Sequence, residues 1–506
     1  MIRKPVARDT CYSLVTGGQT VVRSWLRLER LHTPGQDSPA GWEICTFSEV
    51  VADGKPPRLS RSVHRMSAEG WLDGYRFEEA RRLVIVTRRK GAFIFSDGQY
   101  VISEVQTAPA QHFLESNNFA SISGLFAVLS ALGQRPDSLQ VLPEGSYDVV
   151  PMPISVLPDG SWQFCGLTFD TGPEGLVRSG RIDGQDVVVT AKLQPVPDAL
   201  LAPLHIRPQD NMDAYPVQHR EVTIGSGFGR VFGTLASRPG AASRPELAML
   251  IGGTGRYNRD GKTLSGLNIG YGRFMDGLAH QGLSSLRFDR RPSLGSREVL
   301  TQGDIAAQAL AVLDHVATSL QRRSVVIGHS YGGLVAAQIA QGRSDVALLV
   351  LISTPASTLI QSIQWQRTRA MEKISDPGMR AQYAQAARNF DDKLAHADLD
   401  SLSHVERSSI AFIRSMEGRT VFDSLAAVDA PVLIMQGALD EQVPQADAEV
   451  IADWLRSHGK TAHSLILPDM GHFLTPPEAR QDDLGAAQKL DRDMVQGILS
   501  FLPPLQ

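Results

Sequence analysis

The sequence contains few cysteines, no excess of charge of one sign and no long hydrophobic run. Its 506 residues include only three cysteines, Cys11, Cys45 and Cys165, which are an odd number and lie far apart in the first third of the chain. This spacing fits neither a disulfide framework nor a set of metal ligands. We therefore expect a protein of a reducing compartment, the cytoplasm, without a bound metal.

The charges nearly balance. The chain has 50 Lys and Arg against 54 Asp and Glu, a formal net charge of -4, and it has no run of five or more basic residues. This is not the electrostatic pattern of a protein that binds nucleic acid or an anionic membrane surface. No secretory leader is recognisable, and no segment approaches the roughly 18 apolar residues of a membrane span. We expect a soluble protein, without a nucleic-acid partner, that binds small neutral or weakly polar ligands.

The sequence predicts two domains joined by a linker. Residues 1–200 contain β-type runs separated by Asp-Gly turns, which indicates an N-terminal, mostly antiparallel β domain; the apolar piece 122–132 is expected to be a helix crossing one face of it. The proline-rich stretch 201–216 is suited to a semi-rigid linker. In 217–506, short β-branched runs alternate with helical patterns, which is typical of a parallel sheet flanked by helices.

The second domain is predicted in more detail. A hairpin is expected from residues 220–224 and 231–235, ahead of the central sheet. The stretch 355–430 is helical in pattern and too long for an ordinary connection between strands, so it is interpreted as a helical cap. Central strands are expected at 247–251, 284–288, 324–327, 346–352, 431–435 and 462–467, and helices at 302–320, 331–341, 446–458 and 484–501.

The most informative motif is Gly328-His329-Ser330-Tyr331-Gly332. It lies between an apolar run, 325–327, and a helical pattern, 334–340. A sharp strand-to-helix turn holds its central residue in a strained conformation above the sheet, and the small residues on either side let the backbones pass closely. Ser330 is therefore the candidate nucleophile.

A serine nucleophile requires a base and an acid that orients the base. Asp440 follows the strand expected at 431–435, and His472 follows the next strand. Because the carboxyl ends of parallel strands meet at one edge of a sheet, both side chains can reach Ser330. Glu441 and Asp447 are alternatives for the acid.

An oxyanion formed during acyl transfer requires backbone N–H donors. The N–H of Tyr331 lies at the start of the helix that follows the nucleophile, where the helix dipole favours negative charge. The second donor is expected in Gly252-Gly253-Thr254-Gly255, which follows the strand ending at residue 251. Thr254 is the first choice and Gly253 the second.

These motifs together resemble the α/β-hydrolase superfamily, and most closely its branch of two-domain esterases and serine-aminopeptidase-like hydrolases. The resemblance runs from about Pro216 to the C-terminus and implies an α/β-hydrolase fold in which helical caps shape specificity. The motifs that carry it, in order along the chain, are Gly252-Gly253-Thr254-Gly255-Arg256-Tyr257-Asn258-Arg259-Asp260-Gly261, Arg287-Phe288-Asp289-Arg290-Arg291, the elbow around Ser330, Gly437-Ala438-Leu439-Asp440 and Gly471-His472.

The sequence thus predicts a serine hydrolase that acts on a carboxylic ester or thioester through an acyl-enzyme intermediate, without a cofactor. Acyl transfer, cleavage of a small peptide or amide, and a binding protein that has lost turnover remain alternatives. For the N-terminal domain, covering the active-site mouth, homodimerisation and contact with a carrier protein are all open.

Two further expectations concern neighbouring residues. Asp289 and Arg290 are interpreted as a structural ion pair at a strand end. The aromatic residues of the cap are as well suited to packing its own small core as to lining an acyl pocket, and they are Trp365, Tyr383, Phe390 and Phe412.

Overall fold

The computed structural model divides the chain into two compact units. The first is built from Met1–Pro208, and the second from Gln209–Thr263 together with Asn268–Gln506. Most of the predicted linker 201–216 and the hairpin turn 226–229 fall outside the described residues. The structure describes every residue except 1, 7–8, 17, 36–38, 52–56, 80–81, 90, 97–100, 107–108, 115–118, 144–148, 184–186, 202–214, 226–229, 241–243, 264–266, 291–298, 300, 376, 403, 477–483 and 504–506.

The first unit is built on one large sheet. Its described strands are β1 (Ile2–Pro5), β2 (Thr10–Thr16), β3 (Gln19–His32), β4 (Pro39–Val50), β5 (Arg58–Ser67), β6 (Leu72–Glu79), β7 (Arg82–Arg89), β8 (Ala92–Ser96), β9 (Val101–Gln106), β10 (His112–Leu114), β11 (Ser138–Pro143), β12 (Val150–Val156), β13 (Trp162–Phe164), β14 (Leu167–Thr171), β15 (Val177–Ile182) and β16 (Val188–Leu193). Their order is β10-β11-β12-β13-β14-β15-β16-β2-β3-β4-β5-β6-β7-β8-β9, with β1 paired to β3. Successive strands such as β3 and β4 run antiparallel, whereas β10 and β11 run parallel.

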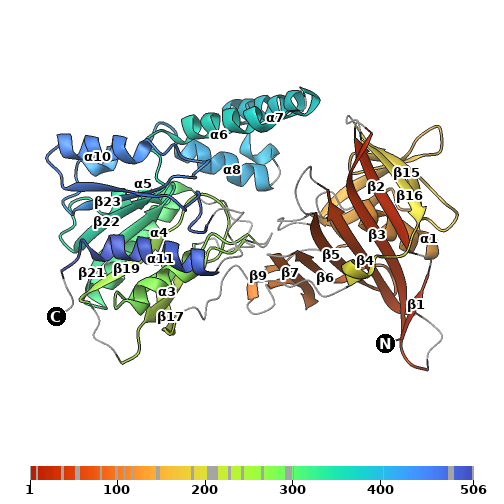
Figure 1. Ribbon diagram of the computed structural model, residues 1–506, viewed down its shortest axis with the longest axis horizontal. Helices are drawn as coiled ribbons and strands as arrows, with labels where there is room; N and C mark the ends of the chain where they lie inside the picture. Colours follow the sequence, from red (N-terminus) through yellow and green to blue (C-terminus); the bar gives the residue numbers. More distant parts are fainter. Residues whose placement is uncertain are drawn as a thin grey trace. The chain divides into compact units, whose positions relative to one another are not determined.

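The helix α1 (Phe119–Ala131) packs against β3 and β4 of this sheet (Figure 1). All its residues from Phe119 to Leu129 are buried, as expected for a helix that is apolar on every side. At Gly124 an added Cβ would come 2.5 Å from Ile44 Cγ2, so glycine lets the helix approach β4 closely. The helix predicted at 122–132 is present and begins at Phe119.

The sheet of the first unit bends back on itself. Leu72, at the start of β6, donates its N–H to the carbonyl oxygen of Ala110 at 2.8 Å, and Ala110 directly precedes β10. Because β10 is the first strand of this order and β6 the fourth from its other end, this contact brings strands from near the two ends of the sheet together. On another face, the short helix α2 (Asp198–Leu201) packs over Cys11 and Cys45 in a small separate core.

The second unit contains a sheet of eight described strands with a parallel core. Its strands are β17 (Gln218–Ile224), β18 (Val231–Ser237), β19 (Glu246–Ile251), β20 (Ser285–Phe288), β21 (Arg323–His329), β22 (Val346–Ile352), β23 (Val432–Gly437) and β24 (Ala462–Leu467), in the order β17-β18-β20-β19-β21-β22-β23-β24. The hairpin β17–β18 is antiparallel, as is the pairing of β18 with β20; the strands from β20 to β24 run parallel. Every residue of β19 and β23 is buried, as expected for parallel strands covered on both faces. The predicted fold class, a β domain followed by an α/β domain, is confirmed.

Helices cover both faces of this parallel sheet (Figure 1). One core cluster contains residues of α4 (Gln302–Thr318), α5 (Gly332–Ile339) and α10 (Asp447–Ser457), and the other contains residues of α3 (Tyr271–His280) and α11 (Leu484–Leu499). The parallel strands then place the segments that follow β19, β21, β23 and β24 at one edge of the sheet.

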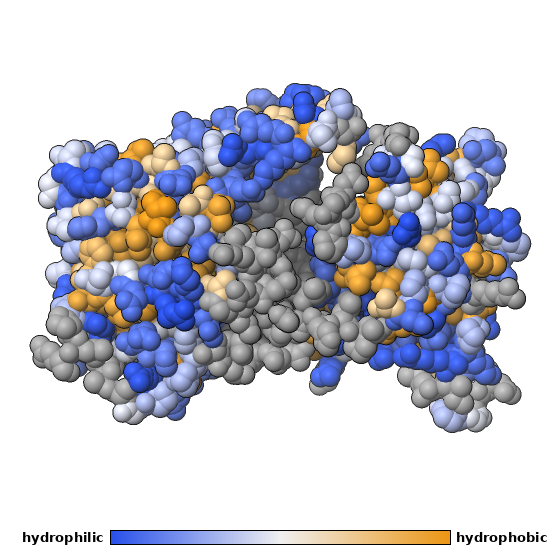
Figure 2. Space-filling view, viewed as in Figure 1, coloured by the Kyte–Doolittle hydropathy of each residue, from blue (hydrophilic) through white to orange (hydrophobic). Residues whose placement is uncertain are grey.

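Four helices lie between β22 and β23, and we call them the helical insertion. They are α6 (Leu359–Lys373), α7 (Pro377–His396), α8 (His404–Ser415) and α9 (Phe422–Leu425), with a 3-10 turn at Leu399–Ser401. Phe390 and Phe412 pack against the core of the second unit, so these two aromatic residues take part in packing. No residue of α7 is buried, and Figure 2 shows a mostly hydrophilic surface over α6 and α7.

Candidate active site

Ser330 occupies a sharp turn between β21 and α5. Its φ of 55° lies in the left-handed region, which is uncommon for a residue with a Cβ. An added Cβ on Gly328 would come 2.5 Å from the carbonyl oxygen of Gly332, and one on Gly332 would collide with the carbonyl oxygen of Ile251. The turn therefore requires glycine at both positions, as the motif predicts.

Asp440 and His472 are directly hydrogen-bonded. His472 Nδ1 lies 3.1 Å from Asp440 Oδ1 and 3.0 Å from Asp440 Oδ2. Because an ionised carboxylate can only accept, Nδ1 carries a proton, and in the neutral imidazole Nε2 is the nitrogen with a free lone pair. The arrangement therefore fixes the tautomer that a general base needs.

The carboxylate of Asp440 has further donors. Oδ1 accepts the N–H of Gln442 at 2.8 Å and that of Val443 at 2.9 Å, and Oδ2 accepts Gln436 Nε2 at 3.0 Å. Burial acts to raise the pKa of Asp440, but the hydrogen bond and charge of His472 and the two backbone N–H groups outweigh it, and the pKa is lowered. Asp440 is therefore ionised at neutral pH.

The two alternative acids have other partners. Glu441 forms an ion pair with Lys373 Nζ at 2.6 Å. Asp447 Oδ2 accepts the N–H of Ala356 at 2.9 Å. Of these three described carboxylates, Asp440 is the one that contacts the imidazole.

Ser330 lies at the same edge of the sheet as the Asp440–His472 pair. Its neighbour His329 binds the carbonyl oxygen of His472 through Nε2 at 2.8 Å, and the two imidazole centroids are 5.0 Å apart. The loop after β19 reaches the same place, since an added Cβ on Gly253 would lie 2.7 Å from Ser330 Cβ and 3.3 Å from Ser330 Oγ. The structure thus gathers the predicted nucleophile, base and acid beside the predicted oxyanion loop.

The two candidate donors in this loop differ. The N–H of Gly253 is donated to Tyr271 Oη at 3.1 Å, so the structure overturns the second choice of oxyanion donor. Thr254, the first choice, is exposed beside it. Tyr331 is the N-cap residue of α5, where the helix dipole favours negative charge. The N–H groups of Tyr331 and Thr254 stay the predicted donors.

The predicted ion pair between Asp289 and Arg290 is wrong. Asp289 Oδ2 binds Arg259 Nη2 at 2.8 Å, and Asp289 Oδ1 accepts the backbone N–H of Arg259 at 2.9 Å. Arg290 binds the carbonyl oxygens of Gly253 at 2.9 Å and Gly255 at 2.5 Å. Successive residues of an extended chain point to opposite sides, so the two neighbours find different partners. Sequence reasoning therefore missed that Arg290 holds the oxyanion loop.

A buried arginine supports the far end of this loop. Arg287, with a side chain only 2% exposed, binds Asp260 Oδ1 through Nε at 2.6 Å and Asp276 Oδ1 through Nη1 at 2.8 Å. Burial acts to lower the pKa of Arg287, but the two carboxylates outweigh it and raise the pKa. Arg287 is therefore a charged structural link between β20, α3 and the loop.

The helical insertion contacts both loops of the candidate site. Gln366 of α6 donates Nε2 to the carbonyl oxygen of Gln442, beside Asp440, at 2.9 Å. Arg256, in the loop after β19, donates Nη2 to Ser408 Oγ of α8 at 3.0 Å. The insertion is thus tied to the acid loop on one side and to the oxyanion loop on the other.

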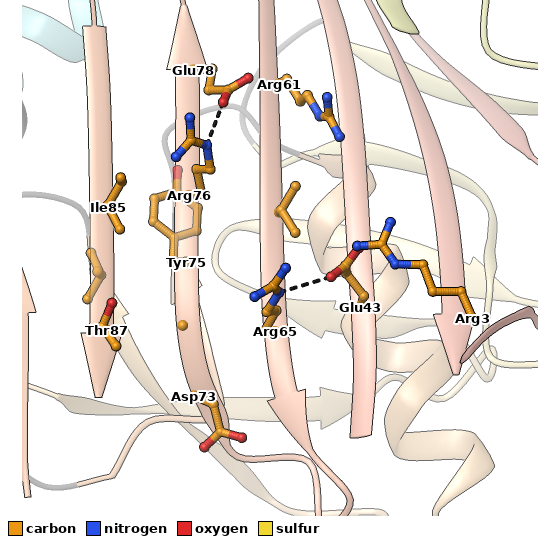
Figure 3. Close-up of a pocket in the computed structure, with 13 residues that line it drawn as sticks. Arg3, Glu43, Arg61, Arg65, Asp73, Tyr75, Arg76, Glu78, Ile85 and Thr87 are labelled. Atoms are coloured by element: carbon orange, nitrogen blue, oxygen red, sulfur yellow. Dashed lines mark hydrogen bonds and ion pairs between the residues drawn. The ribbon is translucent and has the colours of Figure 1, made fainter. Parts of the chain in front are cut away.

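The first unit carries a separate groove of about 640 Å³ on its sheet (Figure 3). Glu43 binds Arg3 Nη2 at 2.8 Å and Arg65 Nε at 3.0 Å, and Arg76 Nε binds Glu78 at 2.5 Å. Three of the four arginines that line the groove therefore have a carboxylate partner. Most of the charge in the groove is compensated by these pairs.

Neither a cluster of metal ligands nor a membrane-spanning helix is found among the described residues. Within them, no group of three or more His, Cys, Asp and Glu side chains is placed to hold a metal ion. In the same part of the chain, every helix is too short or too polar to cross a bilayer.

Comparison with known proteins assigns the second unit to a family. Residues 265–486 match the sequence model of the alpha/beta hydrolase family. No curated protein matches the chain. Similar solved structures include Est1E from Butyrivibrio proteoclasticus (18% identity, 55% of this chain and 99% of that chain covered, TM-score 0.35) and an esterase of Pyrobaculum calidifontis (16%, 57%, 87% and 0.36). A thermophilic esterase from Thermogutta terrifontis is also similar (18%, 56%, 99% and 0.34). On its parallel sheet and this family match, the second unit belongs to the α/β-hydrolase superfamily.

Proposed function

We propose that this protein is a serine hydrolase that cleaves a carboxylic ester or thioester through an acyl-enzyme intermediate. The observation that carries the proposal is the hydrogen-bonded pair Asp440–His472 at the sheet edge where Ser330 sits in a strained turn. An imidazole oriented by a buried carboxylate beside a serine elbow is the arrangement that acyl transfer requires.

In this mechanism Ser330 Oγ attacks the carbonyl carbon while His472 Nε2 takes the hydroxyl proton. The negative charge that develops on the carbonyl oxygen is stabilised by the N–H groups of Tyr331 and Thr254. Collapse of the tetrahedral intermediate breaks the bond to the leaving group, which receives the proton from His472. Water, activated by the same imidazole, then releases the acid, and Asp440 stabilises the imidazolium in both halves of the reaction.

The helical insertion acts as the cap over this site. The contacts from Gln366 to the acid loop and from Arg256 to Ser408 support this role, because they place α6 and α8 beside the two loops that flank the nucleophile. The same triad also serves acyl transfer to an alcohol or amine and cleavage of a small amide. We favour esters and thioesters as substrates because an alcohol or thiol leaves the tetrahedral intermediate more readily than an amine does.

A cytoplasmic location fits the three free thiols. Cys11 and Cys45 are buried, burial raises the pKa of both, and that of Cys45 rises to about 12. Such thiols persist in a reducing compartment. Homodimerisation and contact with a carrier protein through the first unit stay predictions.

The test is hydrolysis of short p-nitrophenyl esters and acyl thioesters by the full chain. The variant Ser330→Ala should lower kcat/KM by about a thousandfold or more. Ser353→Ala is the matched control, because Ser353 also has a positive φ, 47°, at the end of the next strand but is fully buried. A folded wild-type protein without turnover on either substrate class would favour a binding protein.

A further inference from the structure

A chain of buried hydrogen bonds connects the oxyanion loop to the candidate base. Gly253 N donates to Tyr271 Oη at 3.1 Å, and Tyr271 Oη lies 2.8 Å from His329 Nδ1. His329 Nε2 lies 2.8 Å from the carbonyl oxygen of His472. Tyr271 is 2% exposed and His329 is 2% exposed, so water does not compete for these bonds. The chain therefore joins three segments that are remote in sequence.

The chemistry of the partners fixes the direction of every bond. A carbonyl oxygen only accepts, so His329 Nε2 carries the hydrogen that binds His472. In the neutral imidazole Nδ1 then accepts, and Tyr271 donates its hydroxyl hydrogen to it. The hydroxyl oxygen of Tyr271 remains free to accept the N–H of Gly253. Each group thus donates its hydrogen to the next one, from the oxyanion loop towards the base. No single hydrogen bond in this chain can change its direction while the others keep theirs.

His329 stays neutral in this environment. Burial, followed by the neighbouring His472, lowers the pKa of His329 to about 3, although the hydrogen bond to the His472 carbonyl and the charge of Asp440 act in the opposite direction. A neutral imidazole with a fixed tautomer is a stable connector at physiological pH. The imidazole of His329 is therefore unsuited to be the general base, despite its position next to Ser330.

The loop end of the chain is anchored as well. The carbonyl oxygen of Gly253 accepts the hydroxyl of Tyr257 at 2.5 Å and Arg290 Nη1 at 2.9 Å. The guanidinium of Arg290 lies 4.3 Å from the centroid of the Tyr257 ring, within cation–π range. The N–H and the carbonyl oxygen of Gly253 are thus both engaged, and the N–H of Thr254 stays the predicted oxyanion donor of this loop.

We propose that His329 and Tyr271 are positioning residues that hold the backbone of His472 and the oxyanion loop in mutual register around Ser330. This inference rests on the proposed serine hydrolase function. His472 is then held twice, at its ring by Asp440 and at its main chain by His329. Because misplacement of a catalytic group by about 1 Å can cost about a hundredfold in rate, this backbone contact is expected to act on kcat rather than on substrate binding.

The test compares four variants with the wild-type protein. His329→Leu removes the donor to His472, whereas His329→Gln keeps an N–H at a similar reach. Tyr271→Phe removes both the donor to His329 and the acceptor of the Gly253 N–H. Tyr215→Phe is the matched control, because it deletes a tyrosine hydroxyl that binds Asp491 on another side of the same unit.

We expect His329→Leu and Tyr271→Phe to lower kcat about 10- to 100-fold with KM within about threefold of wild type. His329→Gln should recover at least half of the loss on a logarithmic scale, and Tyr215→Phe should match wild type. Spectra of the protein labelled with 15N-histidine should show a slowly exchanging Nε2–H at neutral pH that is absent from His329→Leu. The buried Nε2–H of His64, which binds the carbonyl oxygen of Phe113 at 2.9 Å, should be present in both. Thermal unfolding of each variant checks that the protein is folded.

The outcomes separate this inference from the function on which it depends. A wild-type enzyme that turns over, with folded His329→Leu and Tyr271→Phe variants of unchanged kcat, overturns the positioning role alone. Equal losses of kcat in His329→Leu and His329→Gln also overturn the positioning role, because the N–H that glutamine retains should restore part of kcat. A folded wild-type protein that hydrolyses no ester or thioester overturns the proposed function, whereas the slowly exchanging imidazole proton would still report the hydrogen-bonded chain.

Discussion

His472 Nδ1 lies 3.0 Å from a carboxylate oxygen of Asp440, whose side chain is fully buried, and this contact decides which ring nitrogen keeps a free lone pair. Asp440→Asn keeps the size of the side chain but offers an amide to the imidazole. We expect the wrong tautomer and a loss of about 10⁴ in kcat with a small change in KM. Steady-state kinetics measure both kcat and KM, and Glu441→Gln is the control. Comparable losses in the two variants would contradict the assignment of the acid.

Acid titration of stability reports the neutral state of His329. Its pKa is about 3 in the folded protein and about 6.5 in the unfolded chain, so between these values the unfolded state binds the extra proton. The free energy of unfolding should therefore fall by up to about 1.4 kcal/mol for each pH unit of acidification in this window, in addition to the losses shared with other groups. Urea unfolding of wild type and His329→Gln from pH 7 to 4 isolates this difference. If the free energy of unfolding changed with pH in the same way in both proteins, His329 would be protonated in the folded state.

Replacing a glycine of the turn around Ser330 should lower both stability and activity. Gly328→Ala places a Cβ 2.5 Å from the carbonyl oxygen of Gly332, where the backbone must move. We expect a loss of about 1–3 kcal/mol in stability and a loss of activity. Gly303→Ala is the control, because the atom nearest to its added Cβ is 3.8 Å away and the position is helical. The close packing of the turn is refuted if both alanine variants unfold at the wild-type denaturant concentration.

Arg287 offers a direct measure of a buried ion pair. Arg287→Met removes the guanidinium from Asp260 and from the fully buried Asp276, which keeps only the imidazole of His219 at 2.9 Å, and we expect a loss of about 3–5 kcal/mol in the free energy of unfolding. Arg343 also binds two aspartates but is more exposed, so Arg343→Met should cost less than about 1 kcal/mol. Chemical denaturation of both variants gives the comparison. Similar losses would show that burial does not set the cost here.

The elements that the sequence predicts well are those with a short-range signal. Central strands of the second unit such as β22 are apolar along their whole length, and the turn at Ser330 is recognisable from its glycines. The pairing of Asp440 with His472 follows from one rule, that parallel strands end at one edge.

Other features depend on contacts that the local sequence does not show. The helix α3 was not predicted, because it begins after Gly270 in a left-handed conformation without a side-chain cap and buries Arg273 and Asp276 among its apolar residues. Its polar residues are satisfied by distant partners, for example Asp491 for Arg273. Its buried apolar residues follow the spacing of an amphipathic helix, a signal that sequence reasoning missed; they are Tyr271, Phe274, Met275 and Leu278. The hydrogen bond from Gly253 to Tyr271 and the ion pair of Asp289 with Arg259 likewise join residues that are distant in the sequence. They arise when remote segments meet in the fold.

The most direct test of the central claim is the site of covalent modification by a fluorophosphonate. Peptide mass mapping of the treated full chain should find one adduct, on Ser330. His472→Ala should slow its formation by at least about a hundredfold, and Ser330→Ala should abolish it. A folded wild-type protein that stays unmodified, or an adduct on another serine with Ser330 intact, would contradict the account.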